Sequence, residues 1–311
     1  MRSSNIKWRC ARSHPATVLM LGAAIIVALG AAPGFSHQPR LSRQPGAPSI
    51  PPGLDEQVVK FDGTELDVLT YRPRQCTPSS LLLVFHGLQR NADGYRDAAR
   101  KVANRNCMII VAPLFDKERF PSWAYQRGGI VRDGAVRAQR TWTVNFVPDV
   151  ADWARRATGL DDYYLIGHSA GGQFLSRVAA FAPTQAKGIV IANPSSHVMP
   201  SLDVKAPYGL GSAYPRSEAT AALRRYLAQP VTILLGGEDD DEDAQDLSKT
   251  NEATQQGATR LERGQNAYRA GQKAAQERGW TFNWRMAEVP GVGHSARRMF
   301  SSPEAEAALG K

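Results

Sequence analysis

Short, unbroken apolar segments recur along the chain after residue 80, and stretches with helical periodicity lie between them. The apolar segments lack two-residue alternation, which is typical of parallel strands covered on both faces. We expect strands at 81–85, 108–112, 163–166, 188–192, 231–235 and 282–289. We expect helices at 92–103, 148–157, 170–181, 218–227, 261–278 and 303–309. The alternation predicts an α/β fold with a mostly parallel, doubly wound sheet.

Two further strand-like segments, 57–61 and 65–71, precede this pattern and flank the dipeptide Asp62-Gly63. Asp-Gly favours a tight hairpin turn because both residues tolerate positive φ. We therefore expect an antiparallel hairpin to open the sheet. Because no internal repeat and no second composition-defined region is visible, we interpret residues 53–311 as one domain.

The first 36 residues have a different character from the rest. An apolar run at 16–32 follows four basic side chains, namely Arg2, Lys7, Arg9 and Arg12. This pattern predicts a secretory signal peptide and hence an exported protein, periplasmic or secreted. Small residues fit cleavage after Ser36, with Gly34 at the −3 position, or slightly earlier at Ala31 and Ala32; we expect cleavage near His37. The alternative is an uncleaved signal anchor, which would be the chain's contact with a membrane.

Residues 37–52 are rich in Pro, Ser, Gly and Gln, so we interpret them as a linker. Export would place Cys76 and Cys107 in a compartment where disulfides persist. Cys76 shortly precedes one predicted strand and Cys107 immediately precedes another, so a parallel pair would bring both cysteines to one sheet edge. We predict a disulfide between them, with two buried free thiols as the alternative.

The net charge of +9 is partly a property of the N-terminal segment. Residues 1–36 hold four basic and no acidic side chains, which leaves 34 basic against 29 acidic side chains in the remainder. No basic run is interleaved with aromatic residues. Nucleic-acid binding therefore has little support.

The pentapeptide Gly167-His168-Ser169-Ala170-Gly171 follows one predicted strand and opens a predicted helix. It fits the G-x-S-x-G nucleophile elbow, in which a sharp strand-to-helix turn exposes the serine. The five-residue pattern is weak by itself, and a glycine-rich turn without chemistry is the alternative. The strand–turn–helix context makes Ser169 our candidate nucleophile.

A serine hydroxyl needs a neighbouring base, which is most often a histidine oriented by a buried carboxylate. His294 ends a glycine-rich loop directly after the last predicted strand, so we assign it as the general base. His197 precedes the expected acid, against the usual order of serine, acid and histidine. We interpret His197 as a pocket-rim residue or a solvated loop histidine. His86 and His168 adjoin glycine turns and are given supporting roles.

The acid is expected after the strand at 231–235, where Gly236 and Gly237 precede six consecutive acidic residues. Counting three residues from Gly236 selects Asp239, and counting from Gly237 selects Asp240. Asp241 also remains open, and we take Asp239 as the candidate acid.

Calcium binding is an alternative use of the acidic run, because Asp239, Asp241 and Asp243 share the spacing of EF-hand ligands. Ala244 stands where that loop needs glycine, and Thr250 stands where it needs a bidentate glutamate. A solvated acidic loop with one buried aspartate is the better interpretation, and we expect no metal.

Backbone N–H groups should stabilise the negative charge that develops on a substrate carbonyl oxygen. One donor is expected at Ala170, directly after the nucleophile. The other is expected at Leu88, in the loop His86-Gly87-Leu88-Gln89 that follows the strand at 81–85. A simple turn into the next helix is the alternative for this loop.

These residues resemble the secreted poly(3-hydroxybutyrate) depolymerase-like and feruloyl-esterase-like branch of the α/β-hydrolase family. The resemblance covers nearly all of the chain after the linker. It rests on residues 83–95, 167–172 and 290–294, in the same order. It implies the α/β-hydrolase fold and esterase activity without a cofactor.

Together these observations predict an exported serine esterase that forms an acyl-enzyme. Soluble esters or short hydroxyalkanoate oligomers are the expected substrates, because nothing after the closing helix is expected to bind solid polymer. A serine peptidase or acyltransferase could use the same residues. A non-catalytic binding protein of this fold would typically have lost a member of the Ser169, Asp239 and His294 set.

The walls of the substrate pocket are expected from segments 115–142 and 194–214, which have no readable periodicity. Their aromatic residues either stack on an aromatic acyl group or pack the loops; they are Trp123, Tyr125, Trp142 and Tyr208. The sequence does not indicate an oligomeric state.

Overall fold

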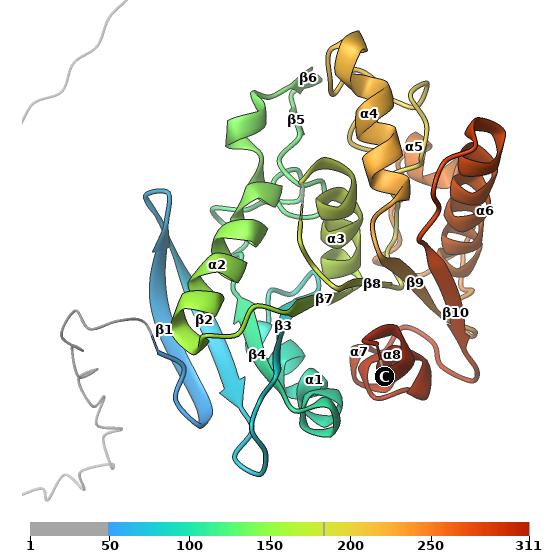
Figure 1. The fold of residues 1–311 in the computed structure, drawn as a ribbon. Helices are drawn as coiled ribbons and strands as arrows, with labels where there is room; N and C mark the ends of the chain where they lie inside the picture. The colour runs from blue at the N-terminus through green and yellow to red at the C-terminus, as the bar shows by residue number, and fades with distance from the viewer. Residues whose placement is uncertain (1–48, 183, 311) are drawn as a thin grey trace, which may run out of the picture. The chain divides into compact units, whose positions relative to one another are not determined.

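The computed structural model describes residues 49–182 and 184–310 (Figure 1). The predicted signal segment and most of the predicted linker lie outside these residues. Ile50, near the end of the predicted linker, is buried, and its carbonyl accepts a hydrogen bond from Arg72 Nη1 at 3.3 Å. Packed structure therefore begins ahead of Gly53. Among the described residues, no helix has both the length and the apolar character needed to cross a bilayer.

The predicted hairpin is confirmed as β1 (Gly53–Phe61) and β2 (Thr64–Arg72), which pair antiparallel. At the turn, φ is 42° at Asp62 and 82° at Gly63. Positive φ at both central residues gives the turn a twist that matches the flanking strands. Half-buried and exposed positions alternate along β1, as expected for a strand with one solvated face.

The central sheet has eight strands among the described residues, in the order β1-β2-β4-β3-β7-β8-β9-β10. The added strands are β3 (Ser80–Phe85), β4 (Met108–Pro113), β7 (Tyr163–His168), β8 (Gly188–Ala192), β9 (Val231–Gly236) and β10 (Arg285–Val289). Strand β2 pairs antiparallel with β4, and the pairs from β4 to β10 are all parallel. Every residue of β3, β4, β8 and β9 is buried, as the unbroken apolar segments predicted.

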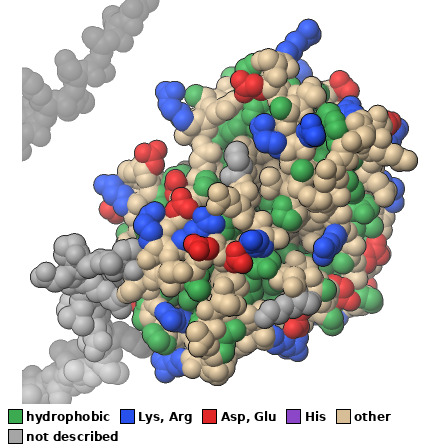
Figure 2. All heavy atoms as spheres, in the orientation of Figure 1, with side chains coloured by type: hydrophobic (Ala, Val, Ile, Leu, Met, Phe, Trp, Pro, Cys, Tyr) green, Lys and Arg blue, Asp and Glu red, His purple; other side chains and the backbone are tan. Residues whose placement is uncertain are grey.

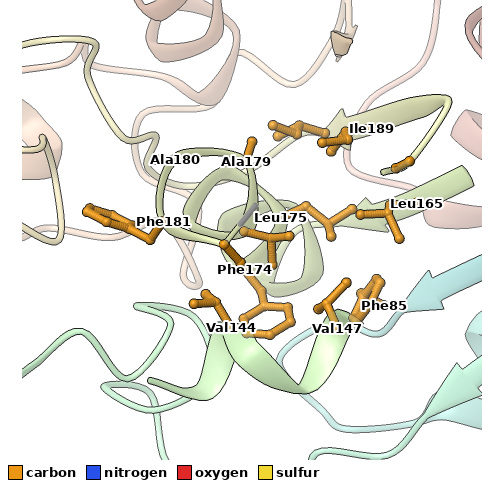
Figure 3. Close-up of a cluster of buried hydrophobic side chains, with 14 of the residues drawn as sticks. Phe85, Val144, Val147, Leu165, Phe174, Leu175, Ala179, Ala180, Phe181 and Ile189 are labelled. Carbon is orange, nitrogen blue, oxygen red and sulfur yellow. The ribbon is translucent and has the colours of Figure 1, made fainter. Parts of the chain in front are cut away.

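Helices cover both faces of this sheet (Figure 1). One face carries α2 (Phe146–Thr158), α3 (Ala170–Phe181), α4 (Arg216–Leu227) and α6 (Arg260–Arg278). The other carries α1 (Ala92–Asn106), α7 (Ala296–Phe300) and α8 (Pro303–Ala308). Each layer has its own buried cluster. In the first, Phe174 and Leu175 of α3 pack among side chains of the sheet and the α2 region (Figure 3).

Several short elements were not predicted. They are β5 (Val131–Arg132), β6 (Ala135–Val136), two 3-10 turns at Gln139–Thr141 and Thr143–Asn145, α5 (Asn251–Thr254) and α7 (Ala296–Phe300). Of the aromatic residues in segments 115–142 and 194–214, Tyr125, Trp142 and Tyr208 are buried. Trp123 lies 5.0 Å and 5.2 Å from the guanidinium groups of Arg132 and Arg137. These aromatic rings therefore pack the loops rather than offering a stacking surface to a substrate.

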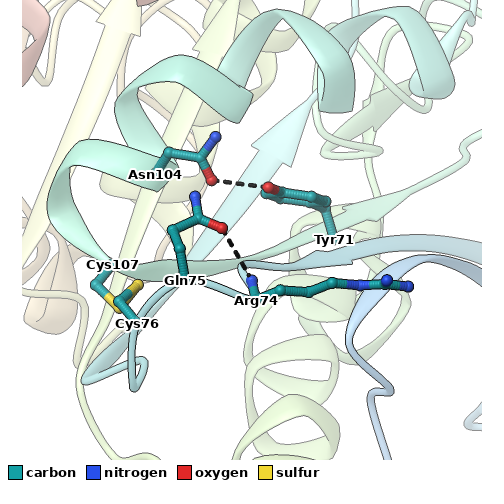
Figure 4. The surroundings of a disulfide bond; sticks show 6 residues. All are labelled: Tyr71, Arg74, Gln75, Cys76, Asn104 and Cys107. Carbon is teal, nitrogen blue, oxygen red and sulfur yellow. Dashed lines mark hydrogen bonds between the residues drawn. A yellow bond between two sulfur atoms is a disulfide. The ribbon is translucent and has the colours of Figure 1, made fainter.

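Cys76 and Cys107 form a disulfide (Figure 4). Cys107 directly precedes β4, and Ser80 at the start of β3 pairs with Met108 at the start of β4. The parallel register thus brings both cysteines to one sheet edge, as the sequence predicted. The bridge joins positions 31 residues apart, a loop whose closure stabilises a fold by about 3 to 4 kcal/mol in the chain-entropy model.

Positive and negative side chains are interspersed on the face of the domain shown in Figure 2. That face presents no extended field of one sign. A polyanion would therefore find no continuous basic surface there.

Candidate active site

Ser169 occupies a sharp turn between β7 and α3. Its φ of 58° and ψ of −118° are unusual for a residue with a side chain. The turn is close-packed, since a Cβ on Gly171 would lie 2.2 Å from the carbonyl oxygen of Phe85. The Ser169 N–H donates to Ala192 O at 3.0 Å. Among the described residues, the Ser169 hydroxyl has no hydrogen-bond partner, so it is free to meet a ligand.

The structure brings His294 and Asp239 together. His294 Nδ1 lies 2.7 Å from Asp239 Oδ2, and Asp239 is only 4% exposed. Asp240 and Asp241 are exposed. Of the three aspartates that the sequence left open, Asp239 is therefore the one placed to orient the imidazole. Its contact assigns the proton on Nδ1 and leaves Nε2 as the acceptor of the neutral ring.

Backbone contacts hold the histidine loop, residues 290–294, against the end of β9. The Glu238 N–H donates to Val292 O at 3.0 Å. Asn193, which follows β8, contacts both segments. Its Oδ1 accepts from the Gly236 N–H at 2.8 Å, and its Nδ2 donates to Gly293 O at 3.4 Å. The acid loop and the histidine loop are thereby fixed to the carboxyl ends of neighbouring parallel strands.

Two residues that sequence analysis missed complete this arrangement. Arg260, at the start of α6, is 1% exposed, and its Nη1 donates to Asp239 Oδ1 at 3.2 Å. Its Nη2 donates to Asp246 Oδ1. The other oxygen of Asp246 lies 3.5 Å from His294 Nε2. Arg260 thus joins the two carboxylates, and His294 lies between them with its hydrogen bond to Asp239.

The loop after β3 is anchored by His86, which is fully buried. His86 Nε2 accepts from the Phe115 N–H at 3.0 Å, and Nδ1 lies 3.0 Å from Gly87 O. Burial lowers the pKa of His86 to about 3, so the ring is neutral and its proton is assigned to Nδ1. Tyr125 donates its hydroxyl to the carbonyl of His86 at 2.8 Å. The supporting role predicted for His86 is therefore to shape this loop.

The two predicted oxyanion donors have no competing partners. Among the described residues, no acceptor takes a hydrogen bond from the N–H of Leu88 or of Ala170. Leu88 lines the same pocket as Ser169, and Ala170 follows Ser169 as the first residue of α3. Both groups are therefore available to a ligand.

His168 packs against the candidate base. The ring centroids of His168 and His294 are 4.4 Å apart, and the Tyr95 hydroxyl lies 3.3 Å from His168 Nδ1. Burial, and secondly the charges of His294 and Arg260, hold the pKa of His168 well below its ordinary value. A neutral His168 backed by Tyr95 therefore limits the positions that the His294 ring can take.

The structure corrects both interpretations of His197. This residue is 1% exposed and does not line the pocket beside Ser169. Its N–H donates to Gln256 Oε1 at 2.8 Å, and Gln256 Nε2 donates back to its carbonyl at 2.9 Å. Burial lowers the pKa of His197 to about 3. His197 is a neutral residue of the interior rather than a rim or solvated histidine.

A cavity of about 390 Å³ opens above Ser169. Its walls are mostly polar. They come from the loop after β3, from the turn at Ser169, from the acidic loop (residues 238–246) and from the histidine loop. They are formed by Gly87, Leu88, Gln89, Asn91, Tyr95, His168, Ser169, Gln245, Asp246, His294 and Ala296. Among the described residues, no group of three or more His, Cys, Asp or Glu side chains is arranged to hold a metal ion, and this includes the acidic run.

Comparison with known proteins shows the family to which this chain belongs. The family model described as "alpha/beta hydrolase fold" matches residues 80–300. No curated protein matches the chain. Among solved structures, the chain is similar to poly(aspartic acid) hydrolase-1 from Sphingomonas sp. KT-1, with 35% identity and a TM-score of 0.77. That match covers 84% of this chain and 100% of the other.

Two further structures share the fold. A poly(3-hydroxybutyrate) depolymerase from Bordetella parapertussis is 33% identical with a TM-score of 0.71, over 79% of this chain and 88% of its own. A fluorophosphonate-binding serine hydrolase from Staphylococcus aureus is 13% identical with a TM-score of 0.51, over 83% and 98%, and supports the fold alone. The chain belongs to the alpha/beta hydrolase fold family.

Proposed function

We propose that this chain is a serine hydrolase that cleaves carboxylic esters, with Ser169 as nucleophile, His294 as general base and Asp239 as the orienting acid. The carrying observation is the contact between Asp239 and His294 Nδ1 beside an elbow serine whose hydroxyl is unpartnered among the described residues. The fold family and its hydrolase neighbours support the same reaction class.

The proposed reaction is a two-step acyl transfer. Ser169 Oγ attacks the ester carbonyl while His294 Nε2 takes the serine proton, and Asp239 stabilises the imidazolium that forms. In this proposal the N–H groups of Leu88 and Ala170 donate to the oxyanion, a contribution of about 3 kcal/mol per donor in related sites. His294 then protonates the departing alcohol. Water, deprotonated by the same imidazole, releases the acid from Ser169.

The pocket favours neutral substrates over polyanions. The two similar hydrolases are described as acting on poly(aspartic acid), a polyanion, and poly(3-hydroxybutyrate), an uncharged polyester. Among the described residues that line the present pocket, there is no lysine or arginine, and Asp246 contributes a carboxylate. We therefore propose soluble esters or short hydroxyalkanoate oligomers as substrates. Export directed by the N-terminal segment completes the proposal.

A fluorophosphonate probe and a series of p-nitrophenyl esters test this function. The wild-type protein should be labelled on Ser169, and Ser169→Ala should lose labelling and about 10⁴-fold or more of its esterase activity. Ser217→Ala, an exposed serine in α4, is the matched control and should retain both. Undiminished labelling of Ser169→Ala would refute the assignment.

The choice of acid can be checked in the same assay. Asp239→Asn should lower kcat by about 10³- to 10⁴-fold, because the imidazole loses its orienting partner. Asp240→Asn removes a neighbouring charge from an exposed position and should leave kcat within about twofold. Equal losses in the two variants would remove Asp239 from its proposed role.

A further inference from the structure

One carboxylate in the pocket has no place in the proposed reaction. Asp246 lines the cavity beside Ser169 and His294. Its side chain is 39% exposed, whereas that of Asp239 is 4% exposed. Asp239 is fully engaged by Arg260 and by His294 Nδ1. Asp246 therefore presents the more accessible negative charge in the immediate surroundings of the nucleophile.

In the described part of the chain, the pocket wall around Asp246 presents a negative charge and no cation. The two carboxylates of Asp239 and Asp246 share the guanidinium of Arg260, so with a neutral imidazole the group carries a net charge of −1. No lysine or arginine is among the described residues that line the pocket. Arg263, a buried cation whose charge acts on Arg260, donates to backbone carbonyls and does not line the pocket. Arg298, close in sequence to His294, donates instead to the carbonyl of Gly291. A positive group entering the cavity would face the Asp246 carboxylate with no cation among the described lining residues to repel it.

The position of Asp246 also affects the base. Its Oδ2 lies 3.5 Å from His294 Nε2, the nitrogen that must accept the proton of Ser169. With the ring proton on Nδ1, Nε2 and Oδ2 are both acceptors, so the carboxylate places negative charge beside the base without a hydrogen bond to it. A ligand cation that pairs with Asp246 would offset this charge. An anionic ligand would instead be repelled by the carboxylate.

We propose that Asp246 is a specificity-determining residue that selects esters carrying a cationic group close to the scissile bond and disfavours esters carrying an anionic group there. This inference rests on the proposed ester hydrolysis at Ser169. It assigns to the acidic loop a role in substrate choice. The cationic group can be any ammonium or guanidinium of matching reach, in either the acyl or the alcohol part.

Charge-matched esters test the proposal. Butyrate esters of choline, of its uncharged isostere 3,3-dimethylbutanol and of an anionic sulfoethyl alcohol differ in charge at one position. A second set carries the same groups in the acyl chain. The wild-type protein should have a kcat/KM about tenfold higher for the cationic ester than for its neutral isostere in at least one set. The anionic ester should be about tenfold poorer than the neutral one.

Two isosteric variants separate the pocket charge from the charge of the loop. Asp246→Asn should reduce the cation preference to about onefold to twofold and should raise kcat/KM for the anionic ester. Asp243→Asn removes one charge from an exposed site in the same loop, outside the pocket lining, and should retain the wild-type ratios. A wild-type ratio near one in both sets, or equal losses of preference in the two variants, would overturn the proposal.

The outcome can be distinguished from failure of the proposed function. If neutral esters are hydrolysed but charge has no effect, the specificity role fails and the esterase assignment stands. If Ser169 is not labelled and no ester is cleaved, the function itself fails. Calorimetric binding of tetramethylammonium to the wild-type protein and to Asp246→Asn then decides the inference alone. Tighter binding by the wild-type protein supports it, and equal binding rejects it.

Discussion

The turn that carries Ser169 and the acidic loop that carries Asp239 and Asp246 line the same pocket, but different forces hold them. The serine turn is set by the main chain, through a constrained backbone and the close approach of Gly171 to the carbonyl of Phe85. The acidic loop is held by backbone bonds near Asp239 and, in addition, by the ion pairs of buried Arg260 with Asp239 and Asp246. The Arg260–Asp239 pair is buried, whereas Asp246 is partly exposed and can meet the charge of a substrate.

The largest expected effect on stability comes from removing the ion pairs of Arg260. Arg260→Met leaves the buried carboxylate of Asp239 without its cation, and we expect a loss of about 3 to 5 kcal/mol of unfolding free energy. Arg105→Gln removes a pair with Glu306 whose side chains are 46% and 32% exposed, and should cost at most about 1 kcal/mol. Urea unfolding of both variants measures the difference. Similar losses of unfolding free energy in the two variants would show that the buried pairs of Arg260 stabilise the fold no more than an exposed pair does.

A smaller effect on stability is expected from a change in the backbone turn that carries Ser169. Gly171→Ala forces α3 away from β3, because the new Cβ would lie 2.2 Å from a backbone oxygen. We expect a destabilisation of about 1 to 3 kcal/mol, together with a fall in kcat of up to about 100-fold as Ser169 is displaced. Steady-state kinetics and urea unfolding check both. Wild-type kcat in this variant would mean that the turn tolerates movement, against our account of it.

The smallest effect concerns pH and comes from two buried histidines that lie outside these two segments. Burial lowers the pKa of both histidines to about 3. His86 begins the loop 86–89 that holds Leu88, and His197 contacts Gln256. In the unfolded chain these groups titrate near about 6.5, so below that pH the unfolded state binds protons that the folded state does not. Stability is therefore full above about pH 6.5 and falls as the pH drops toward 3.

Each of these histidines should contribute a slope of up to about 1.4 kcal/mol per pH unit in this range. Replacing His197 by Gln should remove one such contribution from the slope of unfolding free energy between pH 6 and 4.5. Urea unfolding at a series of pH values measures it. An unchanged slope would show that His197 takes up a proton in the folded state.

The two regions also differ in how far the sequence predicted them. Helix 170–181 was predicted with the bounds that the structure has, because the elbow requires glycine at fixed positions and those requirements are local. Arg260 and Asp246 were missed, because their partners are chosen by contacts between a loop and a distant helix start, for which periodicity carries no information. His197 was misread for the same reason, since its burial depends on Gln256, a residue 59 positions away.

The sequence also did not predict how the aromatic residues around Trp123 and Trp142 pack. These residues could not be divided between pocket and core from sequence, because the short elements of this segment are stabilised by loop packing rather than by a repeating pattern. The disulfide was easier to predict, because it depended on the register of two clear strands, in which Ser80 lies beside Met108.

A crystal structure of the phosphonylated protein would test the central claim most directly. We predict phosphorus bonded to Ser169 Oγ, with the phosphonyl oxygen about 2.7 to 3.1 Å from the nitrogens of Leu88 and Ala170. His294 Nε2 should face Ser169 Oγ while Nδ1 keeps its contact with Asp239. A His294 imidazole more than about 6 Å from Ser169 Oγ would leave the hydroxyl without a proton acceptor and would contradict the account.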